Sequence, residues 1–262
     1  MQLEGMSAKS DDLRSLALGN YGNFTSMRVE GMRVRGLSVH LDRLVGDSEQ
    51  LFGQSVDPER VRQLVRQAVS DAPDPIIVRV TVFAPDFTMS QPSRKVEPKI
   101  LVTLRPAPPV PQAPLRVKLV QYERELPLVK HVGLFGQLWQ RRLAQINGFD
   151  DALFVDSAGR ISEGATWNIA FMKSNQATWP SATYLPGVTM RLIQALMSQA
   201  GIESVTAPVH AENVSEMQCA FATNAATGLR LISEVDDYKL TTDWAALEAL
   251  SESYLTTPGE PL

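Results

Sequence analysis

The stretch GRISEGATWNIAFMK, residues 159–173, decides how the second half of the chain is interpreted. Its pattern predicts a strand, a tight turn and a second strand, with apolar residues concentrated in the second half. Glu163 lies near the middle, next to Gly164, and Asn168 follows. A buried carboxylate needs a cation or several donors as partners, whereas a carboxylate at the end of a hairpin is solvated. The local sequence leaves both interpretations of Glu163 open.

The composition is that of an ordinary globular chain, with 262 residues, 44% of them hydrophobic and 21% charged, and a net charge of −4. This weakly acidic balance gives no electrostatic reason to expect nucleic acid or an anionic membrane as a partner. Cys219 is the only cysteine and the three histidines are scattered, so neither a disulfide within the chain nor a metal site is expected. The N-terminus lacks a signal-peptide pattern, and no apolar run approaches the ~20 residues that span a bilayer. We therefore expect a cytoplasmic protein.

The segment RPAPPVPQAPLR, residues 105–116, differs in composition from its surroundings because it carries five prolines in twelve residues. Such a density removes backbone donors and favours an extended path, which is typical of a linker. We expect a domain boundary there. It separates an N-terminal α/β domain, residues 1–115, from a larger C-terminal domain, residues 116–262.

Local patterns predict both strands and helices in each domain. The N-terminal elements are strands at 23–30 and 76–84 and helices at 38–53 and 57–71, the second helix with Asp57 as N-cap and Pro58 in its first turn. The C-terminal elements are a strand at 115–124, a helix at 133–148, a hairpin joined at DSAG (156–159), a helix at 185–201, and strands near 202–208 and 219–224. Strands and helices are interleaved without a regular βαβ period, which indicates an α+β (mixed α/β) fold.

Three further positions are candidates for chemistry. Lys130, in PLVKHVGLF, lies between an apolar stretch and a helix start. A desolvated lysine there would have a lowered pKa and a nucleophilic amine, although a solvated lysine is the more common case. Gly187 and Thr189 open a predicted helix, whose free N–H groups and dipole suit a phosphate, yet many helices open this way without a ligand. Arg43 points away from the apolar stripe of its helix, either to clamp a phosphate oxygen or to be solvated.

Five motifs occur in one order along the chain: HLDRL (40–44), LVKHVGL (128–134), DSAGRISEGATWNIAF (156–171), LPGVTMR (185–191) and FATNAATG (221–228). In this order and spacing the chain resembles the class IV (fold-type IV) pyridoxal-phosphate enzymes, from about Gly22 to Asp236. That family includes branched-chain and D-amino acid aminotransferases, amine transaminases and 4-amino-4-deoxychorismate lyase. The resemblance implies a two-domain homodimeric enzyme with pyridoxal 5'-phosphate in the cleft between domains and a small amino or keto compound as substrate.

The resemblance also implies a role for each matched residue. Lys130 is the catalytic residue, which attaches covalently to the cofactor and moves the substrate proton, and Glu163 faces the pyridine nitrogen and keeps it protonated. The other cofactor-binding positions are Arg43, Thr189 and the backbone of Val188 for the phosphate, Leu185 against the ring, Asn168 as support for the Glu163 loop, and Asn224 and Ala225 in the second phosphate loop. Glu163 would then be buried because a pyridinium is its counter-charge.

The chain departs from the family pattern at several positions. Phe135 stands where the family commonly has a tyrosine that bonds the ring hydroxyl, and Ala225 stands where branched-chain aminotransferases have a threonine. An arginine that many members carry near Phe83 is missing, which leaves the substrate carboxylate site undefined. We expect an aminotransferase that moves an amino group between an amino acid or amine and a keto acid. One alternative is the lyase, which releases pyruvate and 4-aminobenzoate and which Asn224 and the NFTSMRV strand favour; the other is a cofactor-binding protein without catalysis.

Overall fold

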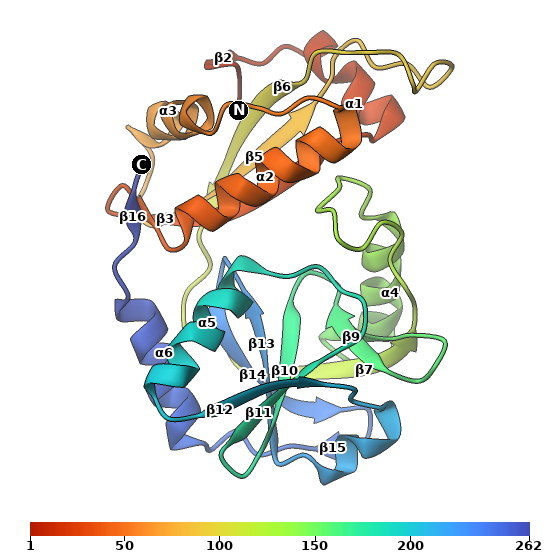
Figure 1. Cartoon of the computed structure of the whole chain (residues 1–262), viewed down its shortest axis with the longest axis vertical. Coiled ribbons are helices and arrows are strands. Elements are labelled where there is room, and N and C mark those ends of the chain that lie inside the picture. Colours follow the sequence, from red (N-terminus) through yellow and green to blue (C-terminus); the bar gives the residue numbers. More distant parts are fainter. The chain divides into compact units, whose positions relative to one another are not determined.

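The computed structural model describes all residues from 1 to 262 and divides them into two compact units (Figure 1). Unit 1 comprises Met1–Pro108, Val129–Gly133 and Pro258–Leu262, and unit 2 comprises Pro109–Leu128 and Leu134–Thr257. The units are therefore not contiguous in the sequence, unlike a single division at the proline-rich segment. Residues 129–133, which include Lys130, belong to unit 1, although they follow the proline-rich segment in the chain.

Unit 1 is built on a seven-stranded sheet in which all neighbours are antiparallel. In spatial order its strands are β16 (Glu260–Pro261), β4 (Arg33–Val34), β3 (Asn23–Glu30), β5 (Ile76–Phe83), β6 (Lys99–Pro106), β1 (Gln2–Leu3) and β2 (Met6–Ser7). The register places Phe24 opposite Thr81 and Ser26 opposite Arg79. Because side chains alternate between the faces of a strand, Phe24, Arg79 and Thr81 share one face.

The opposite face of this sheet is covered by α2 (Leu37–Phe52) and α3 (Pro58–Val69), and α2 runs across it in Figure 1. Apolar residues of both helices pack with β3, β5 and β6 in one cluster. The start of α3 confirms the expected N-cap, because the Asp57 side chain accepts a hydrogen bond from the Glu59 amide (2.9 Å). The short η1 (Asp11–Leu13) and α1 (Arg14–Gly19) were not expected from the sequence.

Unit 2 contains a nine-stranded mixed sheet. In spatial order its strands are β12 (Glu203–Ala207), β11 (Gln176–Pro180), β10 (Asn168–Lys173), β13 (Cys219–Asn224), β14 (Gly228–Val235), β7 (Leu115–Gln121), β8 (Asp151–Val155) and β9 (Ile161–Gly164), with β15 (Tyr238–Lys239) paired to β14. Strands from β9 through to β10 contribute to one apolar cluster, so the sheet curls around it. The pairs β12–β11, β14–β7 and β7–β8 are parallel and the others antiparallel.

The helices of unit 2 pack on the outside of this curled sheet. α5 (Val188–Gln199) and α6 (Ala245–Thr256) lie side by side over a second apolar cluster (Figure 1). α4 (Phe135–Ile146) packs on β8 through a third, smaller cluster that includes Ala144 and Phe154, and η2 (Ala211–Glu216) precedes β13. The mixed α+β class expected from the sequence is confirmed.

Residues 159–173 form β9, a tight turn and β10, as the pattern predicts. The two strands do not pair with each other, because β9 is bonded to β8 and β10 to β11 and β13. In the turn the Gly164 amide donates to the Trp167 carbonyl (2.9 Å). A Cβ on Gly164 would lie 2.0 Å from the Trp167 ring, so only glycine fits there.

The β8–β9 hairpin is joined at DSAG, as expected, and Asp156 closes its turn. The buried Asp156 carboxylate accepts hydrogen bonds from the Ala158 and Arg160 amides, both at 2.9 Å, and from the Arg160 side chain at 2.8 Å. Burial opposes ionisation of Asp156, but the hydrogen bonds from Arg160 and Ala158 outweigh it and hold the pKa of Asp156 below its usual range.

The connection between the two sheets is shorter than the proline-rich segment 105–116. β6 extends to Pro106 and β7 begins at Leu115, so only residues 107–114 lie outside the sheets. None of the helices has the length and apolarity that crossing a bilayer requires.

Candidate functional site

Glu163 is buried and ion-paired in the core of unit 2. Its carboxylate lies 3.0 Å from Nη1 of Arg124, and both side chains are 5% exposed. The same Glu163 oxygen accepts a hydrogen bond from the Leu185 amide (3.3 Å). The interpretation of Glu163 as a solvated turn residue is therefore wrong.

Arg124 was not singled out from the sequence. It follows β7 in the polar run Glu123–Arg124–Glu125, which is typical of a solvated loop. The sheet order brings it to Glu163, because β7 pairs with β8 and β8 pairs with β9. No local signal in the sequence could have found this pair, since its partners are 39 residues apart.

Two tyrosines surround this ion pair. Burial raises the pKa of Tyr184, and the negative charge of Glu163 raises it further. Burial also raises the pKa of Tyr122, with Arg124 opposing the shift and Glu125 and Glu163 adding to it. Both hydroxyls therefore stay protonated at neutral pH and can serve as hydrogen-bond donors near the carboxylate.

Asn168 fixes the loop that leads into α5. Its side-chain amide donates to the Leu185 carbonyl (2.8 Å) and its oxygen accepts from the Gly187 amide (3.1 Å). A Cβ on Gly187 would lie 2.2 Å from the Asn168 oxygen, so the close approach requires glycine. Asn168 thus supports the 185–187 loop directly, and that loop in turn donates to Glu163 through the Leu185 amide.

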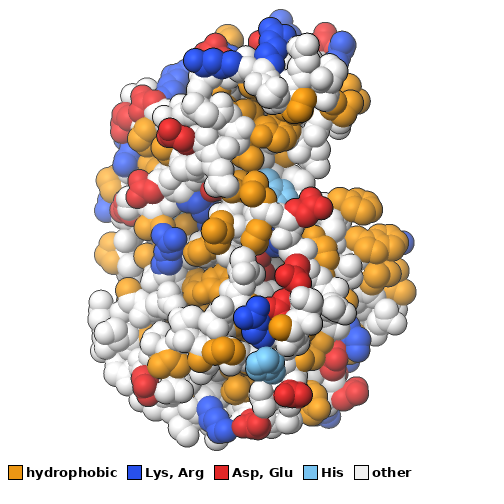
Figure 2. Space-filling view, turned by 45° about the vertical axis from the view of Figure 1, so that its right-hand side comes forward, with side chains coloured by type: hydrophobic (Ala, Val, Ile, Leu, Met, Phe, Trp, Pro, Cys, Tyr) orange, Lys and Arg blue, Asp and Glu red, His pale blue; other side chains and the backbone are white.

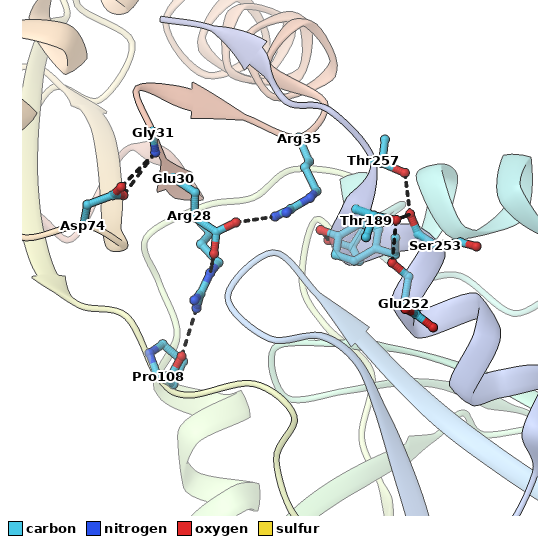
Figure 3. Close-up of polar contacts among 12 residues, drawn as sticks. Arg28, Glu30, Gly31, Arg35, Asp74, Pro108, Thr189, Glu252, Ser253 and Thr257 are labelled. Carbon is cyan, nitrogen blue, oxygen red and sulfur yellow. Dashed lines mark hydrogen bonds and ion pairs between the residues drawn. The ribbon is translucent and has the colours of Figure 1, made fainter.

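α5 begins after Gly187, as the sequence predicts. Val188 and Thr189 are buried in its first turn, where backbone N–H groups have no partner within the helix. The Thr189 hydroxyl lies 3.4 Å from the Tyr254 hydroxyl of α6. Figure 3 shows Thr189 beside the last turn of α6, near Ser253 and Thr257, whose own hydroxyl donates to the Ser253 carbonyl (2.7 Å).

The turn between β13 and β14 is organised by Asn224. Its side-chain oxygen accepts from the Ala226 amide (2.9 Å), the Thr227 amide (3.1 Å) and the Thr227 hydroxyl (3.1 Å). Ala225 is the half-buried residue that starts the turn. The neighbouring Thr223 hydroxyl is buried with no hydrogen-bond partner in the chain. Thr223 lies opposite Asn168 in the register, so this hydroxyl is close to the start of α5.

In unit 1, the Lys130 segment extends the sheet at the beginning of β3. The Phe24 amide donates to the Lys130 carbonyl and the Val132 amide to the Gly22 carbonyl, both at 2.9 Å. The Lys130 amide donates to the buried carboxylate of Asp47 in α2 (3.0 Å). Lys130 is half-buried, and its Nζ lies 4.9 Å from the centroid of the Phe24 ring. An aromatic face, rather than bulk water alone, thus borders the amine.

A second cation contacts the same Phe24 ring. The Arg79 guanidinium lies 3.6 Å from the ring centroid, and its Nε donates to the Thr81 hydroxyl (3.3 Å). Arg79 forms no ion pair with a carboxylate of this chain. Burial lowers the pKa of Arg79, and the positive charge of Arg105 lowers it further. Arg79 lies four residues before Phe83 on the same strand, β5.

Arg43 is half-buried and held by a short chain of hydrogen bonds. Its Nη2 donates to the Thr25 hydroxyl (2.9 Å), which lies 2.7 Å from Nδ1 of His40. Because this hydroxyl accepts from Arg43, its own proton goes to His40 Nδ1. Burial lowers the pKa of His40 well below 6.5, and the charges of Arg43 and Lys130 lower it further. A neutral His40 therefore orients Thr25 beneath the Arg43 guanidinium.

Elsewhere in unit 1, Figure 3 shows Glu30 between Arg28 (2.7 Å) and Arg35 (2.9 Å).

The structure thus groups the expected site residues by unit. Unit 1 holds Lys130 and Arg43, and unit 2 holds Glu163, Asn168, Leu185, Val188, Thr189, Asn224 and Ala225. Phe135, which takes the place of a family tyrosine, is the first residue of α4 and is 79% exposed. Its ring stacks on Trp139 with centroids 6.4 Å apart, so it is directed to the surface of unit 2.

Comparisons with known proteins bear on the family and on the fold. The family model described as amino-transferase class IV matches residues 22–235. A probable branched-chain-amino-acid aminotransferase of Rickettsia bellii is 33% identical over 90 residues, which are 34% of this chain and 31% of that protein. The chain thus spans about a third of the length of the curated relatives it matches.

Two solved structures share the fold. One is a branched-chain aminotransferase from the thermophilic archaeon Thermoproteus uzoniensis with norvaline, with a TM-score of 0.84, 19% identity, and coverage of 95% of this chain and 88% of that one. The other is a putative 4-amino-4-deoxychorismate lyase of Legionella pneumophila, with a TM-score of 0.80, 18% identity, and coverage of 93% and 92%. With the family model matching most of its length, the chain belongs to the class IV aminotransferase family.

Proposed function

We propose that this protein is a pyridoxal 5'-phosphate-dependent aminotransferase that moves an amino group between an amino acid and a keto acid. The observation that carries the proposal is the buried Glu163 carboxylate, held by Arg124 and by the Leu185 amide. Keeping a carboxylate in a core is costly unless it has a counter-charge. A cation of the chain already stabilises Glu163, and a protonated pyridine nitrogen is a second donor that such a carboxylate can accept.

The donor set fits the cofactor group by group. A phosphate dianion needs several N–H and O–H donors, which the first turn of α5 at Val188 and Thr189 and the Arg43 guanidinium provide. The unpaired Thr223 hydroxyl, close to Asn168 and the start of α5, is a further donor without a protein partner. Leu185 provides an apolar contact for a ring, and Asn224 with Ala225 provides a second turn for the phosphate.

When bound, pyridoxal phosphate supplies an aldehyde that exchanges amines and a protonated ring that withdraws electrons from the substrate carbon. The residues of this chain would position the cofactor and move the substrate proton. Glu163 would accept a hydrogen bond from the ring N–H, and Arg124 keeps Glu163 in place. Lys130 Nζ is the base that moves the substrate proton, and the Asp47 carboxylate holds the Lys130 backbone while it does so.

Arg79 supports a substrate that carries a carboxylate. Its guanidinium has only one hydrogen bond within the chain and contacts the same Phe24 ring as the Lys130 amine. Burial makes an unpaired guanidinium a strong partner for an anion, and arginine binds carboxylates through two parallel hydrogen bonds. We assign Arg79 to the carboxylate of the amino and keto acid.

The decisive test is the fate of the cofactor when purified holoenzyme receives an amino acid and no acceptor. An aminotransferase retains the amino group, so the cofactor converts stoichiometrically to its pyridoxamine form. A panel of donors is screened by absorbance, with Lys130→Ala as the inactive control. An unchanged cofactor across the panel, together with pyruvate release from aminodeoxychorismate, would establish the lyase, which the Asn224 loop and the β3 sequence favour. An unchanged cofactor with neither reaction would indicate a binding protein.

We also propose that the protein is a homodimer.

A further inference from the structure

The curled sheet of unit 2 has a polar cavity of about 370 Å³ at one of its ends. β7 and β8 begin at this end, β13 finishes there, and Trp167, just before β10, belongs to the cavity wall. Leu115 and Ala222 make part of the wall apolar, and both pack in the same cluster as Trp167. Ligand pockets in proteins occupy roughly 300–1,000 Å³, so the cavity has room for a small organic acid or a phosphate.

The cavity lies on the other face of the sheet from the proposed cofactor contacts. Ala222 and Asn224, which line the cavity, alternate along β13 with Thr223. Thr223 is opposite Asn168 in the register, and the Asn168 side chain holds the 185–187 loop. Successive side chains of a strand point to opposite faces of a sheet. The cavity is therefore a separate feature from the contacts proposed for Asn168 and Thr223.

The buried carboxylate of the cavity, that of Asp151, is already saturated with donors. One of its oxygens accepts hydrogen bonds from Arg141 Nε (2.9 Å) and from the Ala152 amide (2.8 Å). The other oxygen accepts from Arg141 Nη2 (2.7 Å) and from Trp167 Nε1 (2.8 Å). Four donors fill the acceptor capacity of a carboxylate, and the two-point contact with Arg141 balances its charge. Asp151 therefore has no acceptor left for another cation.

Two other side chains of the cavity carry donors that have no acceptor in this chain. Arg230 Nε donates to the Ala113 carbonyl (2.6 Å), but the two terminal nitrogens of Arg230 form no hydrogen bond or ion pair. Burial lowers the pKa of Arg230, and the charges of Asp150 and Asp151 oppose that shift. The Asn224 oxygen accepts from two amides and a hydroxyl, which leaves both N–H groups of its side-chain nitrogen unused.

We propose that this cavity binds a small anion with a carboxylate or phosphate group, held by Arg230 and Asn224. Ala222 pairs directly with Arg230, and Asn224 lies two residues further along β13, so the two side chains share one face as diagonal neighbours. Such neighbours are roughly 7–8 Å apart, a gap that one anion between them spans. The terminal nitrogens of a guanidinium present parallel N–H groups, which carboxylates and phosphates accept through two oxygens.

The chemistry of the cavity favours an anion over other occupants. A cation would face the unpaired guanidinium of Arg230 and would find the Asp151 carboxylate already occupied. A neutral apolar molecule would leave the free donors of Arg230 and Asn224 without partners, which is costly. Figure 2 shows basic and acidic side chains interspersed on the face that it draws, so a broad basic surface is not what would attract an anion there.

Isothermal titration calorimetry of the purified full chain tests the site, with saturating pyridoxal phosphate present so that the proposed cofactor contacts are filled. The probes are inorganic phosphate and 3-methylbutanoate, a carboxylate without an amino or keto group to react. We expect one saturable site per chain. Binding of phosphate alone would identify a phosphate ligand, and binding of 3-methylbutanoate alone a carboxylate ligand. The readout is binding, so it is independent of the proposed activity.

Two substitutions of Arg230 and one control locate the site. Arg230→Met should weaken binding about ten- to a hundred-fold, as expected for the loss of one charge-assisted contact. Arg230→Lys keeps the charge without the parallel N–H groups and should recover part of that loss. Arg142→Met, at an exposed arginine of α4, is the matched control and should bind as the native chain does.

Asn224→Asp keeps an oxygen for the turn but replaces the N–H donors by a second carboxylate oxygen. It should abolish binding while its urea unfolding stays close to that of the native chain. Arg79→Met, which removes the carboxylate contact assigned in unit 1, should leave this binding unchanged. Binding of neither probe, binding that survives both Arg230→Met and Asn224→Asp, or an equal loss in Arg142→Met or Arg79→Met would each overturn the proposal.

Discussion

Removing Arg124 should destabilise unit 2 far more than removing a surface arginine. Arg124→Met keeps most of the side-chain volume but leaves the Glu163 carboxylate, 5% exposed, with the Leu185 amide as its backbone donor. Removing one partner of a buried ion pair costs about 3–5 kcal/mol. Two unit charges about 4 Å apart attract by about 4 kcal/mol at the effective dielectric constant of a protein, which is the same order.

A double-mutant cycle separates the ion pair from lost packing. Glu163→Gln alone leaves the buried guanidinium without its carboxylate, whereas Arg124→Met combined with Glu163→Gln leaves no buried charge. The double variant should therefore be more stable than the sum of the two losses predicts, by about 2 kcal/mol or more. Arg116→Met is the matched control, since Arg116 and its partner Glu234 are 49% and 21% exposed, and it should lower stability far less than Arg124→Met does.

The assay is equilibrium urea unfolding followed by tryptophan fluorescence. All four tryptophans, Trp139, Trp167, Trp179 and Trp244, lie in unit 2, so the signal reports the unit that holds the pair. Strictly additive single losses, or a loss below about 1 kcal/mol for Arg124→Met, would refute the reasoning. With cofactor present, Glu163→Gln should also lower turnover by orders of magnitude, because a neutral amide does not hold a pyridine ring protonated.

Five further substitutions have defined expected outcomes. Lys130→Ala should abolish turnover and the visible absorbance of lysine-bound cofactor; a borohydride-stable adduct at another lysine, located by mass spectrometry, would contradict the assignment. Arg43→Ala should weaken cofactor binding about ten- to a hundred-fold in equilibrium dialysis, the loss of one charge-assisted contact of about 1.5–3 kcal/mol, and Thr189→Val should cost less; unchanged affinity in Arg43→Ala would remove the residue from the site. Arg79→Met should raise the KM for a carboxylate substrate while kcat stays within a few-fold, and an unchanged KM would count against its role. Burial holds the pKa of His40 in the folded chain below 6.5, so on acidification the unfolded chain takes up the proton first. The contribution of His40 to the free energy of unfolding should therefore be full above about pH 6.5. Below that pH it should fall by up to about 1.4 kcal/mol per pH unit until the folded pKa is reached. Urea unfolding of His40→Asn should lack that slope, and an identical slope in the variant would assign it to other groups.

The sequence by itself determined the local elements and the family. Asp57 before Pro58 marks the start of α3, and the β-branched runs at β3 and β5 form strands where they were expected. These features depend on hydrogen bonds and periodicities within a few residues, so a short window contains all of their physics. The order of the five motifs was enough to predict the class IV family, which the match over residues 22–235 confirms.

The sequence analysis did not predict elements whose local pattern is weak. β6 (Lys99–Pro106) lies partly inside the proline-rich segment, and α6 (Ala245–Thr256) has apolar residues without a clear stripe. β14 alternates buried and half-buried residues irregularly. Such segments become strands or helices because neighbours in space complete their hydrogen bonds and bury their side chains, which no local pattern records.

Only the tertiary structure decided which charges meet. Glu163 and Arg124 come together because β7, β8 and β9 are successive neighbours in the sheet, and Arg79 and Lys130 share the Phe24 ring because β5 and the 129–133 segment both lie along β3. The sequence left Glu163 open between core and solvent, since a carboxylate is buried only where a distant cation or donor is delivered to it. Which cation or donor lies next to Glu163 depends on the order of strands in the sheet, across tens of residues. The free energy of burying the carboxylate therefore depends on the tertiary structure rather than on the local sequence.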